Sequence, residues 1–145
     1  MKKGKFYHGP VGVLKTTTLK AEFEALDHRS KRWIKAREVA LTAERHGLSG
    51  VATIAESVLH LFIDDLGHEA QVVNHFGTVF SPMTELIQAW YDNAHEWPQF
   101  NTTIHFTSNL TPEQLCELYG EYIFDRLVEM CEWVHMDGSS FVSIR

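Results

Sequence analysis

The sequence predicts an α/β protein in which a mostly parallel, five-stranded sheet is covered by helices on both faces, giving three layers. Short apolar, β-prone runs alternate with longer helical patterns along the chain, and this alternation implies crossover connections between parallel strands. The 145 residues are 44% hydrophobic, which is enough for a sizeable core. No repeat, linker or low-complexity tract divides them, so we expect residues 1–145 to form a single domain.

The expected strands are the apolar runs at residues 5–8, 32–36, 58–64, 102–107 and 132–136. Two helix starts between them are well marked. Ser81-Pro82 places a proline in the first turn of a helix over residues 83–93. Thr111-Pro112-Glu113-Gln114 combines a capping threonine, a first-turn proline and a glutamine three residues after the cap. A further helix is expected over residues 39–46, with Gly47 as its stop.

Charge and composition exclude several classes of protein. The net charge is −6, so any contact with nucleic acid or an anionic membrane must be local. The apolar stretch at residues 57–63 is far shorter than the roughly 20 residues that a membrane span needs. The basic start, residues 1–5, leads into no apolar signal segment, which favours a cytoplasmic protein. Cys116 and Cys131 fall in apparently helical segments without CxxC spacing and are interpreted as buried thiols of a reducing compartment.

A candidate phosphate-binding loop follows the first expected strand. Residues 9–17 read Gly-Pro-Val-Gly-Val-Leu-Lys-Thr-Thr and lie between a strand and a helical pattern, where backbone N–H groups and a helix N-terminus can point at one anion. Leu14 stands where the pattern GxxxxGK[ST] has its second glycine. If that position needs a positive φ, leucine costs about 1–2 kcal/mol, roughly tenfold in affinity. A plain strand-to-helix turn is the alternative. The candidate phosphate-binding residues are Gly9, Pro10, Gly12, Lys15, Thr16 and Thr17.

Paired carboxylates, Asp64 and Asp65, end the apolar strand at residues 58–64. The carboxyl ends of parallel strands face the ligand crevice, so both acids are expected beside the phosphate-binding loop. Asp64 would hold Mg²⁺ through water, with Thr16 as a direct ligand, and Asp65 would orient or activate the attacking water. The alternative is that two turn-forming Asp residues simply end a strand.

Two further polar residues are candidates. Asn109 follows the strand at residues 102–107 and could hydrogen-bond the terminal phosphate and the water between it and Asp65, although Asn is also common as a cap or turn residue. Arg126 lies near the middle of a helical segment, and its guanidinium suits contact with a developing phosphate charge. A surface ion pair is the alternative for this residue.

Taken in order, these segments resemble the AAA+ ATPases of the DnaC and IstB type, which are helicase loaders and ATPase helpers of transposition. The resemblance covers almost the whole chain and rests on Phe62-Ile-Asp-Asp-Leu-Gly67, Thr107-Ser-Asn-Leu-Thr-Pro-Glu-Gln114, Tyr119-Gly120 with Asp125-Arg126-Leu127, and Met136-Asp-Gly-Ser-Ser-Phe141. It implies a P-loop NTPase that binds ATP and Mg²⁺ and assembles head to tail on single-stranded DNA, with a replicative helicase or a transposase as partner. The roles that it implies are Walker A contacts for Lys15 and Thr16, the Walker B pair for Asp64 and Asp65, sensor 1 for Asn109, and a finger toward a neighbouring subunit's ATP for Arg126.

The sequence also departs from the pattern of this family. Besides Leu14, Val142 stands where the family usually has an Arg that serves as or near a second sensor, and the nearby arginine is Arg145. The helix after the acid pair often carries Arg-Tyr, and here it has Trp90-Tyr91. Because the chain begins at the first expected strand, we expect it to lack the N-terminal region by which such proteins grip a helicase or a transposase.

The histidines, a basic cluster and a group of aromatic residues give weaker evidence of function. The nine histidines show no close metal-ligand spacing, so no zinc site is predicted. The basic cluster at residues 28–37 could track a single-stranded backbone while Trp33 stacks on a base, or it could be a solvated strand edge. Aromatic residues around residues 93–101 could form either a hydrophobic cluster beneath a loop or an exposed contact patch: Trp90, Tyr91, Trp97 and Phe100.

Three hypotheses remain open at this point. The favoured one is an ATPase of the DnaC and IstB type. The second is a degenerate relative in which Leu14 has removed tight nucleotide binding, leaving a module that binds DNA or a partner protein. A small P-loop kinase acting on a metabolite is least favoured, because no lid of clustered Arg residues is evident.

Overall fold

The computed structural model describes residues 2–11 and 14–137. Its main sheet has five strands in the order β2-β3-β6-β1-β7, and every neighbouring pair is parallel. The α/β class and the parallel five-stranded sheet are therefore confirmed. Each strand lies within two residues of its expected position: β1 (Gly4–His8), β2 (Lys31–Lys35), β3 (His60–Asp64), β6 (Thr103–Ser108) and β7 (Cys131–His135).

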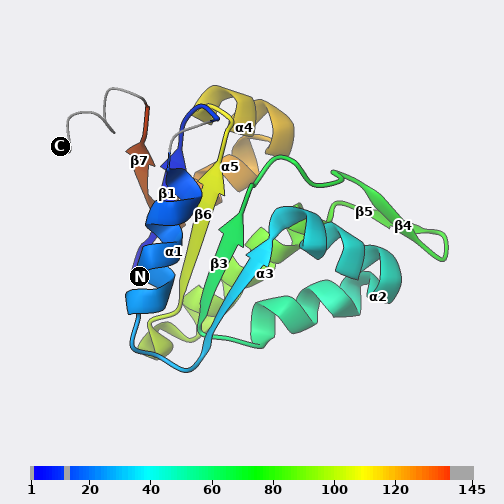
Figure 1. Ribbon diagram of the computed structural model, residues 1–145. Helices are drawn as coiled ribbons and strands as arrows, with labels where there is room; N and C mark the ends of the chain where they lie inside the picture. Colours follow the sequence, from blue (N-terminus) through cyan, green and yellow to red (C-terminus); the bar gives the residue numbers. More distant parts are fainter. Residues whose placement is uncertain (1, 12–13, 138–145) are drawn as a thin grey trace.

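Helices cover both faces of the sheet. The larger core lies on the face that packs against the helices α2 (Ala36–Glu56), α3 (Pro82–Glu96), α4 (Pro112–Tyr119) and α5 (Glu121–Met130). The opposite face is covered by α1 (Lys15–Ala25) over a smaller cluster, in which Tyr7 and Phe62 meet Leu19. Figure 1 shows α1 on one side of the strands and α3 and α5 on the other. Alternate strand residues point to opposite faces, so Phe6 packs in the larger core and Tyr7 in the smaller one.

The long helix α2 is kinked at Gly47, which has φ 69° and ψ −157°. A helix stop at Gly47 is the expected behaviour of a glycine with positive φ, but a second helical stretch follows directly and reaches Glu56. A Cβ at Gly47 would lie 2.6 Å from the ring of His75. The kink is therefore where a hairpin packs against α2.

This hairpin, formed by β4 (Val73–His75) and β5 (Thr78–Phe80), is a feature that the sequence analysis missed. Its strands are only three residues long, and its turn residues, Phe76 and Gly77, both have positive φ. His75 Nδ1 lies 2.9 Å from the carbonyl oxygen of Glu44 in α2, which fixes the hairpin to the helix.

The helix boundaries and aromatic residues partly match expectation. The capping box at Thr111 and Gln114 forms as predicted, with both of its hydrogen bonds. The helix α3 reaches Glu96 and is followed by the 3-10 helix η1 (Pro98–Phe100), so residues 93–101 are not a plain loop. The aromatic residues divide between the two readings, because Trp90 is buried in the core while Trp97 and Phe100 are exposed.

The two cysteines are unpaired. Cys131 begins β7 and does not lie in a helix, which corrects the expectation for this residue; its buried thiol donates to the carbonyl oxygen of Ile104. Cys116 lies in α4 and is only half-buried.

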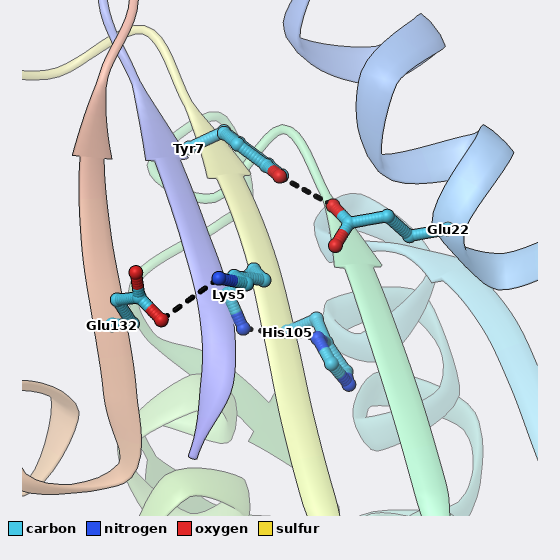
Figure 2. A network of polar contacts seen from close by, with 5 residues as sticks. All are labelled: Lys5, Tyr7, Glu22, His105 and Glu132. Carbon is cyan, nitrogen blue, oxygen red and sulfur yellow. Dashed lines mark hydrogen bonds and ion pairs between the residues drawn. The ribbon is translucent and has the colours of Figure 1, made fainter. Parts of the chain in front are cut away.

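A polar network crosses the sheet face beneath α1 (Figure 2). The ammonium of Lys5 pairs with Glu132 at 2.8 Å, and the backbone N–H of Lys5 donates to His105 Nδ1 at 3.0 Å. The hydroxyl of Tyr7 donates to Glu22 of α1. These contacts link β7, β1, β6 and α1 on the side of the sheet that carries the smaller hydrophobic cluster.

The basic cluster lies at an edge of the sheet, because β2 is the outermost strand. Lys31 donates to the carbonyl oxygens of Phe23 and Leu26, and the ammonium of Lys20 lies 4.5 Å from the centre of the Trp33 ring. Lys20 therefore covers one face of the ring that was considered for stacking on a base. Within residues 2–11 and 14–137, no helix is both long and apolar enough to cross a membrane.

Candidate nucleotide-binding site

The candidate site lies where the strands β1, β3 and β6 end. Figure 1 shows their carboxyl ends at one edge of the sheet, beside the N-terminal end of α1. The loop that leads from β1 to α1 begins at Gly9, whose N–H donates to the carbonyl oxygen of Ser108 at 3.2 Å. Gly9 has φ 153°, and a Cβ here would lie only 1.7 Å from the carbonyl oxygen of Met136. Glycine is therefore required at this position by close packing against the chain that follows β7. Gly12 lies outside the described residues.

Lys15 is the first residue of α1, and only 4% of it is exposed. Its ammonium donates to the carbonyl oxygen of Pro10 at 2.7 Å, so the side chain folds back under the loop. Burial lowers the pKa of Lys15, while the carboxylates of Asp65 and Asp64 act in the opposite direction. The ammonium of Lys15 thus lies against the loop and is influenced electrostatically by the acid pair.

The loop and the acid pair meet directly at Thr16 and Asp64. The Thr16 hydroxyl donates to Asp64 Oδ1 at 2.8 Å, across 48 residues of sequence. Asp64 is 4% exposed, and the same oxygen accepts a second hydrogen bond from the Thr107 hydroxyl at 2.6 Å. Thr17, one residue further along α1, is exposed. The expected convergence of the turn at residues 9–16 with the acid pair is therefore present.

Asp65 is held differently from Asp64. It has φ 62°, which is uncommon for a residue other than glycine. Its N–H donates to Thr107 Oγ1 at 2.9 Å, so one hydroxyl group contacts both members of the acid pair. Thr107 is a site residue to which the sequence analysis assigned no role. The available signal was a polar residue at the end of the strand next to the one that carries Asp64.

Asn109 lies at the same edge and contacts the loop that follows the acid pair. Its side-chain amide lies 3.2 Å from His68 Nε2. The backbone N–H of His68 in turn donates to the carbonyl oxygen of Asp65 at 3.3 Å. The structure thus brings Asn109 close to the turn at Asp65, and it adds His68, which the sequence analysis did not single out.

Leu14 has a negative φ. It is the N-cap of α1 with φ −83°, and its side chain is 44% exposed. Its carbonyl oxygen accepts hydrogen bonds from the N–H and the hydroxyl of Thr18. The strain that a positive φ would impose at position 14 does not arise in this conformation.

Arg126 belongs to a cluster of aromatic residues. Its guanidinium carbon lies 4.3 Å from the centre of the Tyr91 ring and 4.4 Å from that of Tyr122. The helix α5, which carries Arg126 and Tyr122, packs against α3, which carries Tyr91. Stacked guanidinium groups of this kind gain from the electrostatic attraction of the ring faces. The ion pair considered for Arg126 is thus replaced by stacking on two rings. Val142 and Arg145 lie outside the described residues.

The residues present fit a magnesium-bound nucleotide. Mg²⁺ prefers oxygen ligands and is commonly held by one or two protein groups together with phosphate oxygens and water. Thr16 and Asp64 supply two adjacent oxygens, and Lys15 supplies a positive charge within reach of the loop. In the described part of the chain, no group of three or more His, Cys, Asp or Glu residues could hold a metal ion by itself. This donor set suits an ion that arrives with its phosphates better than a dedicated metal cage.

No protein-family model and no curated protein matches the sequence. Among solved structures, the crystal structure of DnaI matches 93% of this chain and 73% of its own, with 24% identity and a TM-score of 0.66. The crystal structure of the DnaC helicase loader matches 93% of this chain and 78% of its own, with 22% identity and a TM-score of 0.62.

A third match is the replication initiator DnaA bound to AMPPCP and single-stranded DNA. It matches 93% of this chain but only 40% of the DnaA chain, with 18% identity and a TM-score of 0.66. The chain thus spans about three quarters of the two former structures and less than half of DnaA. In its parallel sheet and its helical layers, the chain shares the fold of DnaI and of the DnaC helicase loader.

Proposed function

We propose that this chain binds ATP with Mg²⁺ at the carboxyl ends of β1, β3 and β6 and acts as an ATPase of the helicase-loader type in DNA replication. The hydrogen bond between Thr16 and Asp64 carries the proposal, because it joins the two segments that a P-loop NTPase uses to bind the metal-nucleotide complex. The buried ammonium of Lys15 beside this pair supports it. DnaI, the DnaC helicase loader and nucleotide-bound DnaA share the fold.

Each residue then has a defined task. The backbone of the loop, with Gly9, Pro10 and Gly12, would surround the phosphates, and Lys15 would leave Pro10 to pair with a phosphate oxygen. Thr16 and Asp64 would hold Mg²⁺, which neutralises charge on the phosphates when bound. The task of Thr17 would be to contribute its backbone N–H at the N-terminus of α1.

The attack on the terminal phosphate would depend on the other carboxylate. Asp65 would accept a hydrogen bond from the attacking water and orient it, while Asn109 would contact the phosphate that the water attacks. Arg126 would act on the ATP of a neighbouring subunit in a head-to-tail assembly. To do so, its guanidinium would have to leave the rings of Tyr91 and Tyr122.

The partners are part of the same proposal. Single-stranded DNA is expected to bind the assembled protein, as in the DnaA structure bound to single-stranded DNA. A replicative helicase is the favoured protein partner, and a transposase is the alternative. We place the protein in the cytoplasm, where these partners act, and we propose that the whole chain is one ATPase domain.

A second candidate function is a module that binds DNA or a partner without hydrolysing ATP. Two observations favour it: Leu14 replaces the second glycine of the phosphate-binding pattern, and Arg126 is engaged by two tyrosine rings. Such a module would show no nucleotide-dependent rise in melting temperature at millimolar ATP and Mg²⁺. An intact site with micromolar affinity would gain about 4 kcal/mol of stability under these conditions.

The deciding experiment is a titration with a fluorescent ATP analogue, with and without Mg²⁺ and with and without single-stranded DNA. Lys15→Met should weaken binding by tenfold or more, because a hydrogen bond to a charged group contributes about 1.5–3 kcal/mol. Lys20→Met removes the same charge from the same helix and is the matched control, expected to bind as the parent protein does.

The carboxylate is tested in the same way. Asp64→Asn should remove most of the Mg²⁺ dependence, whereas Asp27→Asn, on an exposed residue, should not. Arg126→Ala should keep nucleotide binding and lose turnover only where subunits associate. Equal affinities for the parent protein, Lys15→Met and Asp64→Asn would contradict the proposed site, and equal loss of turnover by Arg126→Ala in a demonstrated monomer would refute the finger.

A further inference from the structure

The loop after the acid pair contains a buried carboxylate that takes no part in the proposed nucleotide site. Glu69 is only 5% exposed. Its Oε1 accepts the N–H of Gly67 at 2.8 Å, and its Oε2 accepts the Tyr119 hydroxyl and the side-chain amide of Gln71. All three donors are neutral. A carboxylate buried in this way is held in one position by its donors and cannot reach a substrate.

Tyr119 connects this loop to a different part of the chain. It is the last residue of α4, a helix that begins directly after Asn109-Leu110-Thr111. Burial, followed by the negative charge of Glu69, raises the pKa of Tyr119. The Tyr119 hydroxyl therefore stays protonated at neutral pH and remains a hydrogen-bond donor. The helix that follows Asn109 is therefore tied at its far end to the loop that follows Asp65.

The residue between these contacts is strained. Asp65 has φ 62°, and a residue other than glycine keeps such a conformation only where its surroundings fix it. On one side β6 fixes the turn, through the hydrogen bonds from Asp65 N–H to Thr107 Oγ1 at 2.9 Å and from Leu66 N–H to the Thr107 carbonyl oxygen at 2.8 Å. On the other side the turn is fixed by Glu69, which binds Gly67 two residues after Asp65.

Thr107 contacts both Asp64 and Asp65, whereas the Glu69 side of this arrangement is separate from the contacts of Lys15, Thr16 and Asp64. Asp64 is held by the hydroxyls of Thr16 and Thr107, and Lys15 is held by Pro10. None of these hydrogen bonds passes through Glu69 or Tyr119. Loosening the loop on the Glu69 side should therefore disturb Asp65 and the nearby pair of His68 and Asn109, while it leaves Lys15, Thr16 and Asp64 in place.

We propose that Glu69 and Tyr119 are positioning residues that hold the Asp65 turn in its strained conformation and thereby set the rate of ATP hydrolysis, not the affinity for ATP. This inference rests on the proposed ATPase function. It assigns to Glu69 and Tyr119 no contact with nucleotide, metal or water.

The test uses the full chain with Glu69→Ala, Glu69→Gln and Tyr119→Phe. Glu117→Gln, on an exposed acid of α4, is the matched control. Three measurements are made: a titration that gives the Kd for a fluorescent ATP analogue, steady-state kinetics that give the kcat and KM of ATP hydrolysis, and the hydrogen-exchange rates of the amides in residues 64–72. We expect Kd and KM to stay within twofold in all variants. The kcat should fall tenfold or more in Glu69→Ala, and the amides of residues 65–68 should exchange at least tenfold faster.

The milder variants keep the test decisive if Glu69→Ala does not fold. Tyr119→Phe removes a single oxygen atom, and Glu69→Gln retains one acceptor for the N–H of Gly67, so both should show intermediate kcat values and intermediate exchange. Parent-like kcat in Tyr119→Phe and Glu69→Gln would overturn the proposal, as would equal losses in kcat and in affinity. If the parent protein binds ATP and does not hydrolyse it, the proposed ATPase activity fails, and unchanged exchange in the variants separately refutes the positioning role.

Discussion

The histidines on the sheet face beneath α1 predict that the protein loses stability in mild acid. Figure 2 shows His105 with the backbone of Lys5 beside it. The N–H of Lys5 donates to His105 Nδ1, so the neutral ring carries its hydrogen on Nε2, which lies 2.8 Å from Thr103 Oγ1. The Thr103 hydroxyl lies 2.8 Å from His60 Nδ1 and can donate to it. A second proton on either ring would leave this chain of hydrogen bonds with one donor too many.

The size of the effect follows from the pKa of His105. Burial lowers this pKa to about 3, and the positive charges of His60, Lys5 and Lys2 act in the same direction. Below about pH 6.5 the unfolded chain takes up a proton that the folded ring refuses, so stability falls as pH falls, by about 1.4 kcal/mol per pH unit. Between pH 6.5 and 5.0 the expected loss is about 2 kcal/mol from His105 alone. The pKa of His60 is also lowered, chiefly by burial, and adds to the loss in the same direction.

Urea unfolding at pH 7.0, 6.0 and 5.0 measures this loss. In His105→Asn the side-chain oxygen can accept the N–H of Lys5 without titrating, so the dependence of the unfolding free energy on pH should be shallower than in the parent protein by about 2 kcal/mol at pH 5.0. His46→Asn replaces an exposed histidine and is the control, with the slope of the parent protein. The same slope in His105→Asn and in the parent protein would refute the reasoning.

Three further predictions concern stability. Gly9→Ala should lose about 3 kcal/mol or fail to fold, because its Cβ would lie 1.7 Å from the carbonyl oxygen of Met136; a melting temperature equal to that of the parent protein would contradict the packing at the start of the loop. Phe6→Ala should lose about 3–5 kcal/mol in urea unfolding, since the ring is fully buried and stacks on Trp133 at 3.9 Å between centroids; a loss below about 1 kcal/mol would argue against this core. Leu14→Gly should change the unfolding free energy by no more than about 0.5 kcal/mol, because Leu14 is exposed and its φ is negative; a gain above about 1 kcal/mol would reveal strain at this position.

Much of the fold could be predicted from the sequence because its strands are apolar runs separated by helical patterns. Parallel strands end at a common edge, so the sequence alone predicts that Lys15, Thr16 and the acid pair lie together. The hairpin at β4 and β5 could not be predicted in the same way, because three-residue strands leave almost no alternation to detect.

The contacts that complete the site depend on tertiary structure. Thr107 meets Asp64 across 43 residues of sequence, and Tyr119 meets Glu69 across 50. A threonine near the end of a strand and a tyrosine at the end of a helix form no sequence pattern that predicts these distant hydrogen-bond partners. Similarly, nothing local to Arg126 indicates that the ring of Tyr91, on another helix, covers its guanidinium.

The close approach of Gly9 to Met136 places the segment that follows β7 against the start of the loop between β1 and α1. The N–H of Met136 also donates to the carbonyl oxygen of His8 at 2.7 Å, so the chain leaving β7 is anchored on both sides of the point where the loop departs from β1. Gly9 is therefore fixed between β6, through the carbonyl oxygen of Ser108, and the segment that follows β7.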